Sequence, residues 1–177
     1  MKSSAEKYGR LALSLHWISA LLMLVLWPLG FIMARMGDSA NRTSLYRVHV
    51  VIGLLILLLT IIRVIWHFVD VKIDPPPNLA FWNLKAFIWN HNLLYLFLLV
   101  MAASGIAMLQ GSGVSLPAGN ITPDAIAAAD VPARSGHSLF SKVFLLLFLA
   151  HVGGVFRYQF TKGNVLARMG VNWFSKS

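Results

Sequence analysis

Four long apolar segments, separated by shorter polar stretches, dominate the pattern of hydrophobic and polar positions along the chain. They cover residues 11–34, 46–69, 82–110 and 137–160. An α-helix rises about 1.5 Å per residue, so roughly 20 apolar residues cross a hydrocarbon core about 30 Å thick. Each segment is long enough to do so. The pattern predicts an all-α fold, a transmembrane four-helix bundle that forms one domain over residues 1–177.

The composition indicates that most of the chain faces lipid. Hydrophobic residues make up 58% of the sequence and charged residues 12%, whereas soluble domains carry about 25% charged residues. The net charge of +9 could suggest a nucleic-acid partner, but the sequence contains no soluble basic domain, so none is expected. The absence of cysteine excludes disulfides, thiolate-bound zinc, iron–sulfur clusters and covalently attached haem. Histidine is then the natural ligand for a redox metal, and no catalytic residue is assigned.

The distribution of basic residues predicts the orientation of the bundle. Basic residues favour the cytoplasmic side of membrane helices, and the chain places ten on the side of its termini and five on the opposite side. Both termini are therefore expected in the cytoplasm. The inner group is Lys2, Lys7, Arg10, Arg63, Lys72, Lys85, Arg157, Lys162, Arg168 and Lys176. The outer group is Arg35, Arg42, Arg47, Arg134 and Lys142.

The last apolar segment carries two histidines, His137 and His151, fourteen residues apart. On a helix this separation is about 21 Å along the axis and returns to nearly the same face. One imidazole then lies near each side of the membrane, where ionisable residues are costly and are functional candidates by default. Two b-type haems stacked across the bilayer, each taking one axial ligand from this helix, would explain the spacing. Bis-histidine haem iron suits electron transfer.

The other apolar segments supply the possible partners of these two histidines. On the outer side only His49 is available, and Gly53 one turn later would let a flat macrocycle approach the backbone. On the inner side depth alone leaves His16, His67 and His91 as alternatives beside His151. His67 stands at a helix end and is better explained as an interfacial residue. Zinc or copper bound by two histidines would lack ligands.

The longest connection, residues 111–136, is expected to be functional or disordered. A short surface helix that begins near Asp124 is predicted within it. The basic tail that follows the last apolar segment is amphipathic, which suits a cytoplasmic membrane surface with anionic lipid.

Five sequence motifs follow one another along the chain. They are Tyr8-Gly9-Arg10-x5-His16-Trp17, His49-x3-Gly53 leading to Arg63, His91-x3-Tyr95 leading to Gly105, His137-x13-His151, and Asn164-Val165-Leu166-x-Arg168-Met169. Together they resemble the bacterial cytochrome b561 family, which is similar to the cytochrome b subunits of nickel hydrogenases. The resemblance covers nearly the whole chain, and its four-histidine set is its most specific part.

The resemblance implies two haem b groups and selects the partners that depth left open. His16 and His151 would bind the inner haem iron, and His49 and His137 the outer one. Arg63 would be a candidate to contact a haem propionate, although a basic residue at a helix end is more often an interfacial anchor, and His91 would lie behind a ligand or in a quinone site. One departure from the family pattern falls at residues 157–159, where relatives often carry a further histidine; a quinone pocket shaped there would differ in this chain.

The resemblance also implies electron transfer across a bacterial inner membrane, between a quinone pool and an outer partner. The expected activity is that of a superoxide:ubiquinone oxidoreductase, with superoxide oxidised on the periplasmic side and ubiquinone reduced on the cytoplasmic side. The outer basic group would attract a small anion. An alternative is an electron-transfer subunit between quinol and a periplasmic redox enzyme or cytochrome. A third is a haem-free membrane scaffold whose histidines serve helix packing.

Overall fold

The computed structural model describes residues 2–4, 6–114, 121–122, 125 and 131–172. Its helices are α1 (Arg10–Met33), α2 (Ala40–Val69), α3 (Phe81–Gly111), α5 (Val131–Thr161) and the short α6 (Val165–Arg168). No β-strand occurs in the described residues. The surface helix predicted near Asp124 lies outside the described residues.

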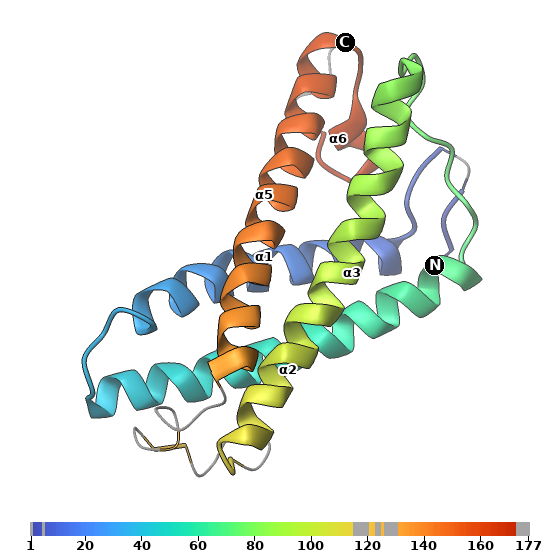
Figure 1. The fold of residues 1–177 in the computed structure, drawn as a ribbon. Helices are drawn as coiled ribbons and strands as arrows, with labels where there is room; N and C mark the ends of the chain where they lie inside the picture. The colour runs from blue at the N-terminus through green and yellow to red at the C-terminus, as the bar shows by residue number, and fades with distance from the viewer. Residues whose placement is uncertain (1, 5, 115–120, 123–124, 126–130, 173–177) are drawn as a thin grey trace.

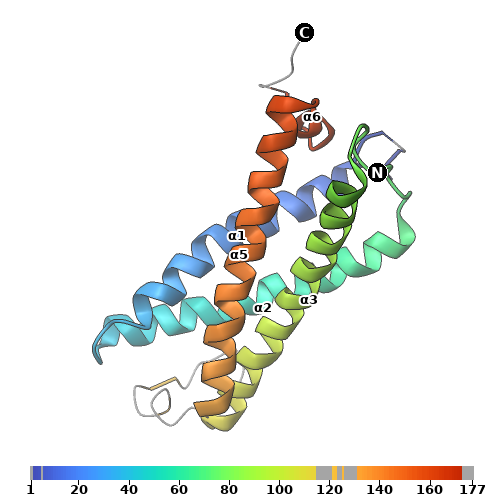
Figure 2. The same ribbon diagram turned by 45° about the horizontal axis from the view of Figure 1, so that its top comes forward.

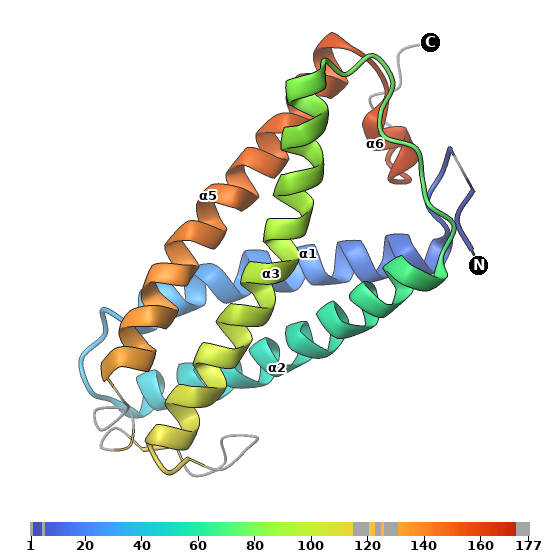
Figure 3. The same cartoon turned by 45° about the vertical axis from the view of Figure 1, so that its right-hand side comes forward.

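The four long helices form two antiparallel hairpins (Figure 1). Helix α1 packs along α2, α3 packs along α5, and α2 also contacts α3. The two hairpins cross and come together where α1 ends and α5 begins, and they diverge toward the chain termini (Figures 2 and 3). We call the end with the α1–α2 and α3–α5 connections the loop side, and the end with both termini the terminal side.

All four long helices have the length and composition of membrane spans. Their outward side chains are apolar and exposed, for example Leu21 at 62% and Leu146 at 67%, as expected where lipid replaces protein contacts. Interior positions such as Ile56, Thr60 and Phe144 are buried. The predicted all-α four-helix membrane bundle is confirmed.

Two helices begin about six residues before their apolar segments. Helix α2 begins at Ala40, where the hydroxyl of Ser39 accepts a hydrogen bond of 3.2 Å from the backbone N–H of Arg42. Helix α5 begins at Val131. Hydropathy misses such turns because they are polar, although a serine before a helix is an N-terminal signal in its own right.

Hydrogen bonds attach the N-terminal segment to the end of α2 on the terminal side. The carboxylate of Asp70 at the end of α2 accepts from the backbone N–H of Ser3 at 2.9 Å, from its hydroxyl at 2.5 Å, and from the indole of Trp66 at 2.9 Å. Desolvation raises the pKa of Asp70, but these hydrogen bonds and one from the Val71 N–H hold it below its usual value. The N-terminal segment is thus attached to the end of α2.

The C-terminal segment is attached to the same side. The indole of Trp17 on α1 donates to the carbonyl of Met169 at 3.0 Å. Tyr158 donates to the carbonyl of Pro77 at 2.8 Å, and the buried Gln159 accepts from the Leu166 N–H at 3.0 Å. The positions where the family pattern often has histidine therefore hold the tail and the α2–α3 connection in this chain.

Candidate functional site

The four histidines singled out by the sequence lie in two pairs inside the bundle. On the loop side His49 of α2 faces His137 of α5, with ring centroids 6.3 Å apart and ring planes at 72°. On the terminal side His16 of α1 faces His151 of α5, also at 6.3 Å, with planes at 54°. All four side chains are half-buried. Helix α5 thus contributes one imidazole to each pair, at two levels of the membrane.

The shared distance fits one metal ion between each pair of rings. A metal binds an imidazole nitrogen at about 2.0 Å, and the ring centroid lies about 1.2 Å behind that nitrogen. Two rings on opposite sides of one ion therefore have centroids roughly 6.4 Å apart. Among the described residues no cluster of three or more His, Asp or Glu could hold a metal. The donor set suits a metal whose remaining ligands come from a macrocycle, as in haem.

The backbones of neighbouring helices lie close to the loop-side pair. A Cβ atom added to Gly30 of α1 would meet Cε1 of His49 at 3.1 Å, and one added to Gly105 of α3 would meet Cε1 of His137 at 3.5 Å. Both glycines let a helix approach an imidazole edge. At Gly53, where the sequence predicted clearance for a macrocycle, no atom lies within 4 Å of an added Cβ, so the space there is free of protein.

Hydrogen bonds orient the ring of His137. Its Nδ1 lies 3.1 Å from the carbonyl oxygen of Met101 and 3.0 Å from the hydroxyl of Ser104. A carbonyl only accepts, so Nδ1 carries the proton and Nε2 keeps a free lone pair. Metal-binding histidines are commonly held in this way. For His49, by contrast, Nδ1 is buried and has no hydrogen-bond partner in the described part of the chain.

Arg63 of α2 lies beside the terminal-side pair. Its Nη2 is 3.2 Å from Nδ1 of His16, and its guanidinium carbon lies 5.2 Å from the ring centroid of Tyr95 on α3. Arginine only donates, so Nδ1 of His16 accepts in this arrangement and the ring proton is on Nε2. Binding a metal through Nε2 as a neutral imidazole requires the proton to move to Nδ1 and the arginine contact to be released.

The two remaining histidines lie differently. The ring of His91 on α3 is 4.9 Å from that of His151, which is too short for an ion between them, and its Nδ1 lies 2.7 Å from the carbonyl of Phe87. His91 therefore stands behind the terminal-side pair. His67 is exposed and contacts the ring of Phe68 at 5.7 Å, apart from both pairs.

Reasoning from the sequence missed Gly30 and Ser104. Gly30 follows Pro28 in α1, and nothing in the sequence shows that this turn faces His49 of another helix. A hydroxyl beside Gly105 in an apolar helix is a weak signal for Ser104, since serine in membrane helices commonly bonds its own backbone. Ser104 does so here as well, donating to the Met101 carbonyl at 2.9 Å.

Comparison with known proteins identifies the family of the chain. Residues 7–171 match the family described as prokaryotic cytochrome b561. The chain is 26% identical to cytochrome b561 homolog 1 of Escherichia coli K12 over 172 residues, which cover 93% of this chain and 97% of the relative. It is 27% identical to cytochrome b561 homolog 2 of the same organism over 113 residues, covering 63% and 60%.

A further relative carries another name. Cytochrome b562 of Cereibacter sphaeroides is 29% identical over 168 residues, covering 92% of this chain and 94% of the relative. The family match spans all four long helices and every histidine of the two pairs. The chain therefore belongs to the prokaryotic cytochrome b561 family, and it is a membrane electron-transfer protein for which that family implies haem b.

Proposed function

We propose that the chain is a di-haem b cytochrome that moves electrons across the bacterial inner membrane. The observation that carries the proposal is the pair of equal histidine separations, 6.3 Å at each of two levels on α5. His49 and His137 would hold the loop-side haem, and His16 and His151 would hold the terminal-side haem. When bound, haem supplies reversible one-electron chemistry at its iron.

The protein's own residues position these groups. The carbonyl of Met101 and the hydroxyl of Ser104 fix the ring of His137 with Nε2 directed away from α3. Arg63, which contacts His16 in the structure, would supply a positive charge for a haem propionate. His91 stays behind His151, where its hydrogen bond to Phe87 fixes its ring. All four ligands come from helices, which hold a site more rigidly than loops do.

The charge distribution supports an orientation with the terminal side in the cytoplasm. The loop side, which then faces the periplasm, carries five basic residues, but several are engaged within the protein. Arg42 pairs with Asp38, Arg35 covers the ring of Phe31, and Arg47 donates to the Ile121 carbonyl at 3.5 Å. Their charge still makes this side attractive to a small anion.

The proposed reaction is the oxidation of superoxide on the loop side, coupled to the reduction of ubiquinone on the terminal side. Two superoxide anions each give up one electron and leave as oxygen. One ubiquinone takes up the two electrons together with two protons from the cytoplasm and becomes ubiquinol. His91, Arg63 and Tyr95 lie close to the terminal-side pair, and their side chains can hydrogen-bond a quinone.

Stopped-flow spectroscopy of the purified holoprotein tests this reaction. A superoxide pulse should reduce the protein, and ubiquinone should then reoxidise it. A protein that quinol reduces, and that is indifferent to superoxide, would instead be an electron-transfer subunit serving a periplasmic redox enzyme or cytochrome. Both functions use the same histidine pairs and haems. The experiment therefore decides only whether superoxide or quinol is the electron donor.

A further inference from the structure

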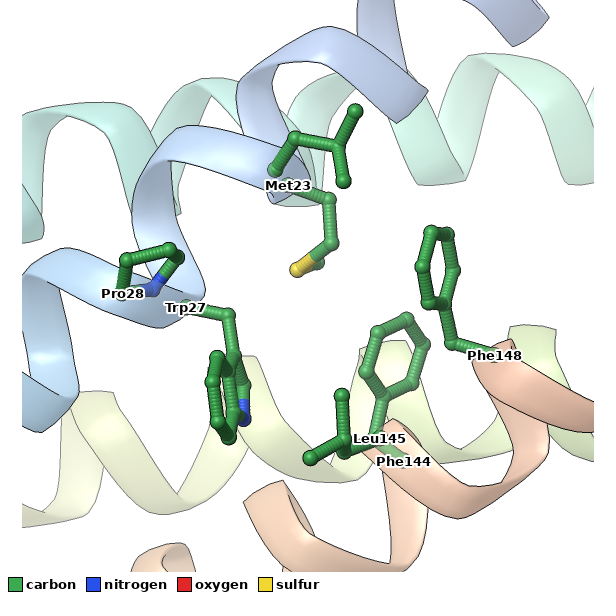
Figure 4. A pocket seen from close by; sticks show the side chains of 7 residues that line it. Met23, Trp27, Pro28, Phe144, Leu145 and Phe148 are labelled. Atoms are coloured by element: carbon green, nitrogen blue, oxygen red, sulfur yellow. The ribbon is translucent and has the colours of Figure 1, made fainter.

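The seam between α1 and α5 contains two hollows at different depths. The hollow at the loop side has a volume of about 450 Å³. It is lined by Ala34, directly after α1, and by five residues of α5: Arg134, Ser135, Ser138, Leu139 and Lys142. The second hollow, of about 70 Å³, lies deeper between the same helices, and its lining is largely apolar (Figure 4). Its lining is Met23, Leu24, Trp27, Pro28, Phe144, Leu145 and Phe148.

The loop-side hollow presents hydrogen-bond donors for which the described residues supply no acceptor. In the described part of the chain, Arg134 and Lys142 form neither an ion pair nor a hydrogen bond. The hydroxyls of Ser135 and Ser138 likewise have no partner among the described residues, whereas Ser141 on the same helix donates to a backbone carbonyl at 2.8 Å. Two cations and two hydroxyls around one hollow match the chemistry of a phosphate group.

The second hollow lies nearer the middle of both helices than the first. On α5 its lining begins at Phe144, just past Lys142, and on the α1 side the nearest lining residues of the two hollows, Ala34 and Pro28, are six positions apart. Six helical residues correspond to about 9 Å. In Figure 4 the side chains of Trp27 and Met23 face those of α5 across the gap. The seam is therefore cationic at the membrane surface and apolar below it.

We propose that this seam binds one anionic phospholipid of the loop-side leaflet. Its phosphodiester lies between Arg134 and Lys142 and accepts hydrogen bonds from the serine hydroxyls. One acyl chain runs past Leu139, which is 58% exposed, into the hollow beside Trp27 and Leu145. The site uses neither histidine pair and goes beyond the proposed electron transfer, which it does not require.

The arrangement favours a lipid over a free anion. A small anion would gain only the charges and hydroxyls, which are exposed to water and salt that screen them. A lipid gains the same contacts and also places apolar chain in the deeper hollow, where each buried methylene adds to the binding. The protein's position in the membrane brings phosphate groups to the level of Arg134 and Lys142.

Native mass spectrometry of the purified holoprotein tests the site, with dioleoyl phosphatidylglycerol as the probe and dioleoyl phosphatidylcholine as the reference lipid. The wild-type protein should retain one phosphatidylglycerol in preference to phosphatidylcholine. A basic residue near the membrane surface attracts anionic lipid, and its loss weakens binding about fivefold. Arg134→Gln or Lys142→Gln should therefore weaken retention about fivefold, and the double variant about twenty-five-fold. The double variant Lys72→Gln/Lys85→Gln removes equal charge on the terminal side and should leave retention unchanged.

Three results would overturn the proposal. The first is equal retention of the two lipids by the wild-type protein. The second is an equal loss in the two double variants, which would show general attraction between a basic protein and an acidic lipid. The third is displacement of phosphatidylglycerol by inorganic phosphate or glycerol 3-phosphate at concentrations comparable to those of the lipid, which would make the hollow a site for free anions. The haem absorbance of each variant shows that it is folded.

Discussion

Replacing Gly30 by alanine tests how closely α1 constrains the loop-side pair. The added Cβ would lie 3.1 Å from Cε1 of His49, where ordinary contacts begin at 3.4 Å, so the ring has to move by a few tenths of an ångström. Overpacking of this kind costs about 1–3 kcal/mol, equivalent to about a 5- to 150-fold loss of affinity for the loop-side haem. The change should leave the terminal-side haem in place.

Gly105→Ala is the matched control, because its Cβ would meet Cε1 of His137 at 3.5 Å, an ordinary contact. Both substitutions replace glycine within a helix, so both gain about 1 kcal/mol of helix propensity. Haem titration of the apoprotein in detergent measures the affinities, and a redox titration shows which of two transitions has moved. Wild-type affinity and potentials in Gly30→Ala, or a larger loss in Gly105→Ala, would refute the close approach of α1 to His49.

Other substitutions separate the roles of individual residues. His137→Ala should halve the haem content, leaving the terminal-side haem, and His67→Ala should change nothing; full occupancy in His137→Ala, measured by the pyridine haemochrome, would contradict the ligand assignment. Ser104→Ala removes a hydrogen bond worth about 0.5–1 kcal/mol, which makes His137 a weaker donor and should raise one midpoint potential by about 20–45 mV; equal movement of both potentials would argue against it. Asp70→Asn tests the terminal-side attachment. Since hydrogen bonds lower the folded pKa of Asp70, its stabilisation is full above the unfolded pKa of about 4 and is lost as pH falls below it. Wild-type protein should therefore lose thermal stability over that range more steeply than Asp70→Asn, and parallel melting curves would contradict the idea.

Hydropathy predicted the spans because lipid demands long apolar segments, and the helices cover all four. It did not predict that α2 begins at Ala40, because the first turns of that helix are polar and extend beyond the hydrocarbon. The signal for them was local, in the cap at Ser39. The length of the apolar segment thus predicts the part of the helix within the membrane, whereas the capping residue predicts where the helix begins.

The histidine pairs could likewise be predicted from the sequence only in part. Spacing along one helix was enough to place His137 and His151 on one face at two levels, because helical geometry is regular. Depth left His16, His67 and His91 open, and the family resemblance selected His16, because spacing along one segment does not contain the packing of α1 against the other helices. In the structure the ring centroid of His151 lies 6.3 Å from that of His16 and 4.9 Å from that of His91, and the longer distance supports the proposed pairing of His16 with His151. The sequence did not identify Gly30 and Ser104 for the same reason, because each contacts a histidine of another helix.

The most direct test of two bis-histidine haems is the haem content and spin state of the purified protein. The proposed histidine pairs predict two haem b per chain, both low-spin in the oxidised state because two imidazoles would bind each iron. Pyridine haemochrome analysis gives the number, and electron paramagnetic resonance gives the spin state. A single haem per chain, or a stoichiometric high-spin signal from an open axial position, would contradict it.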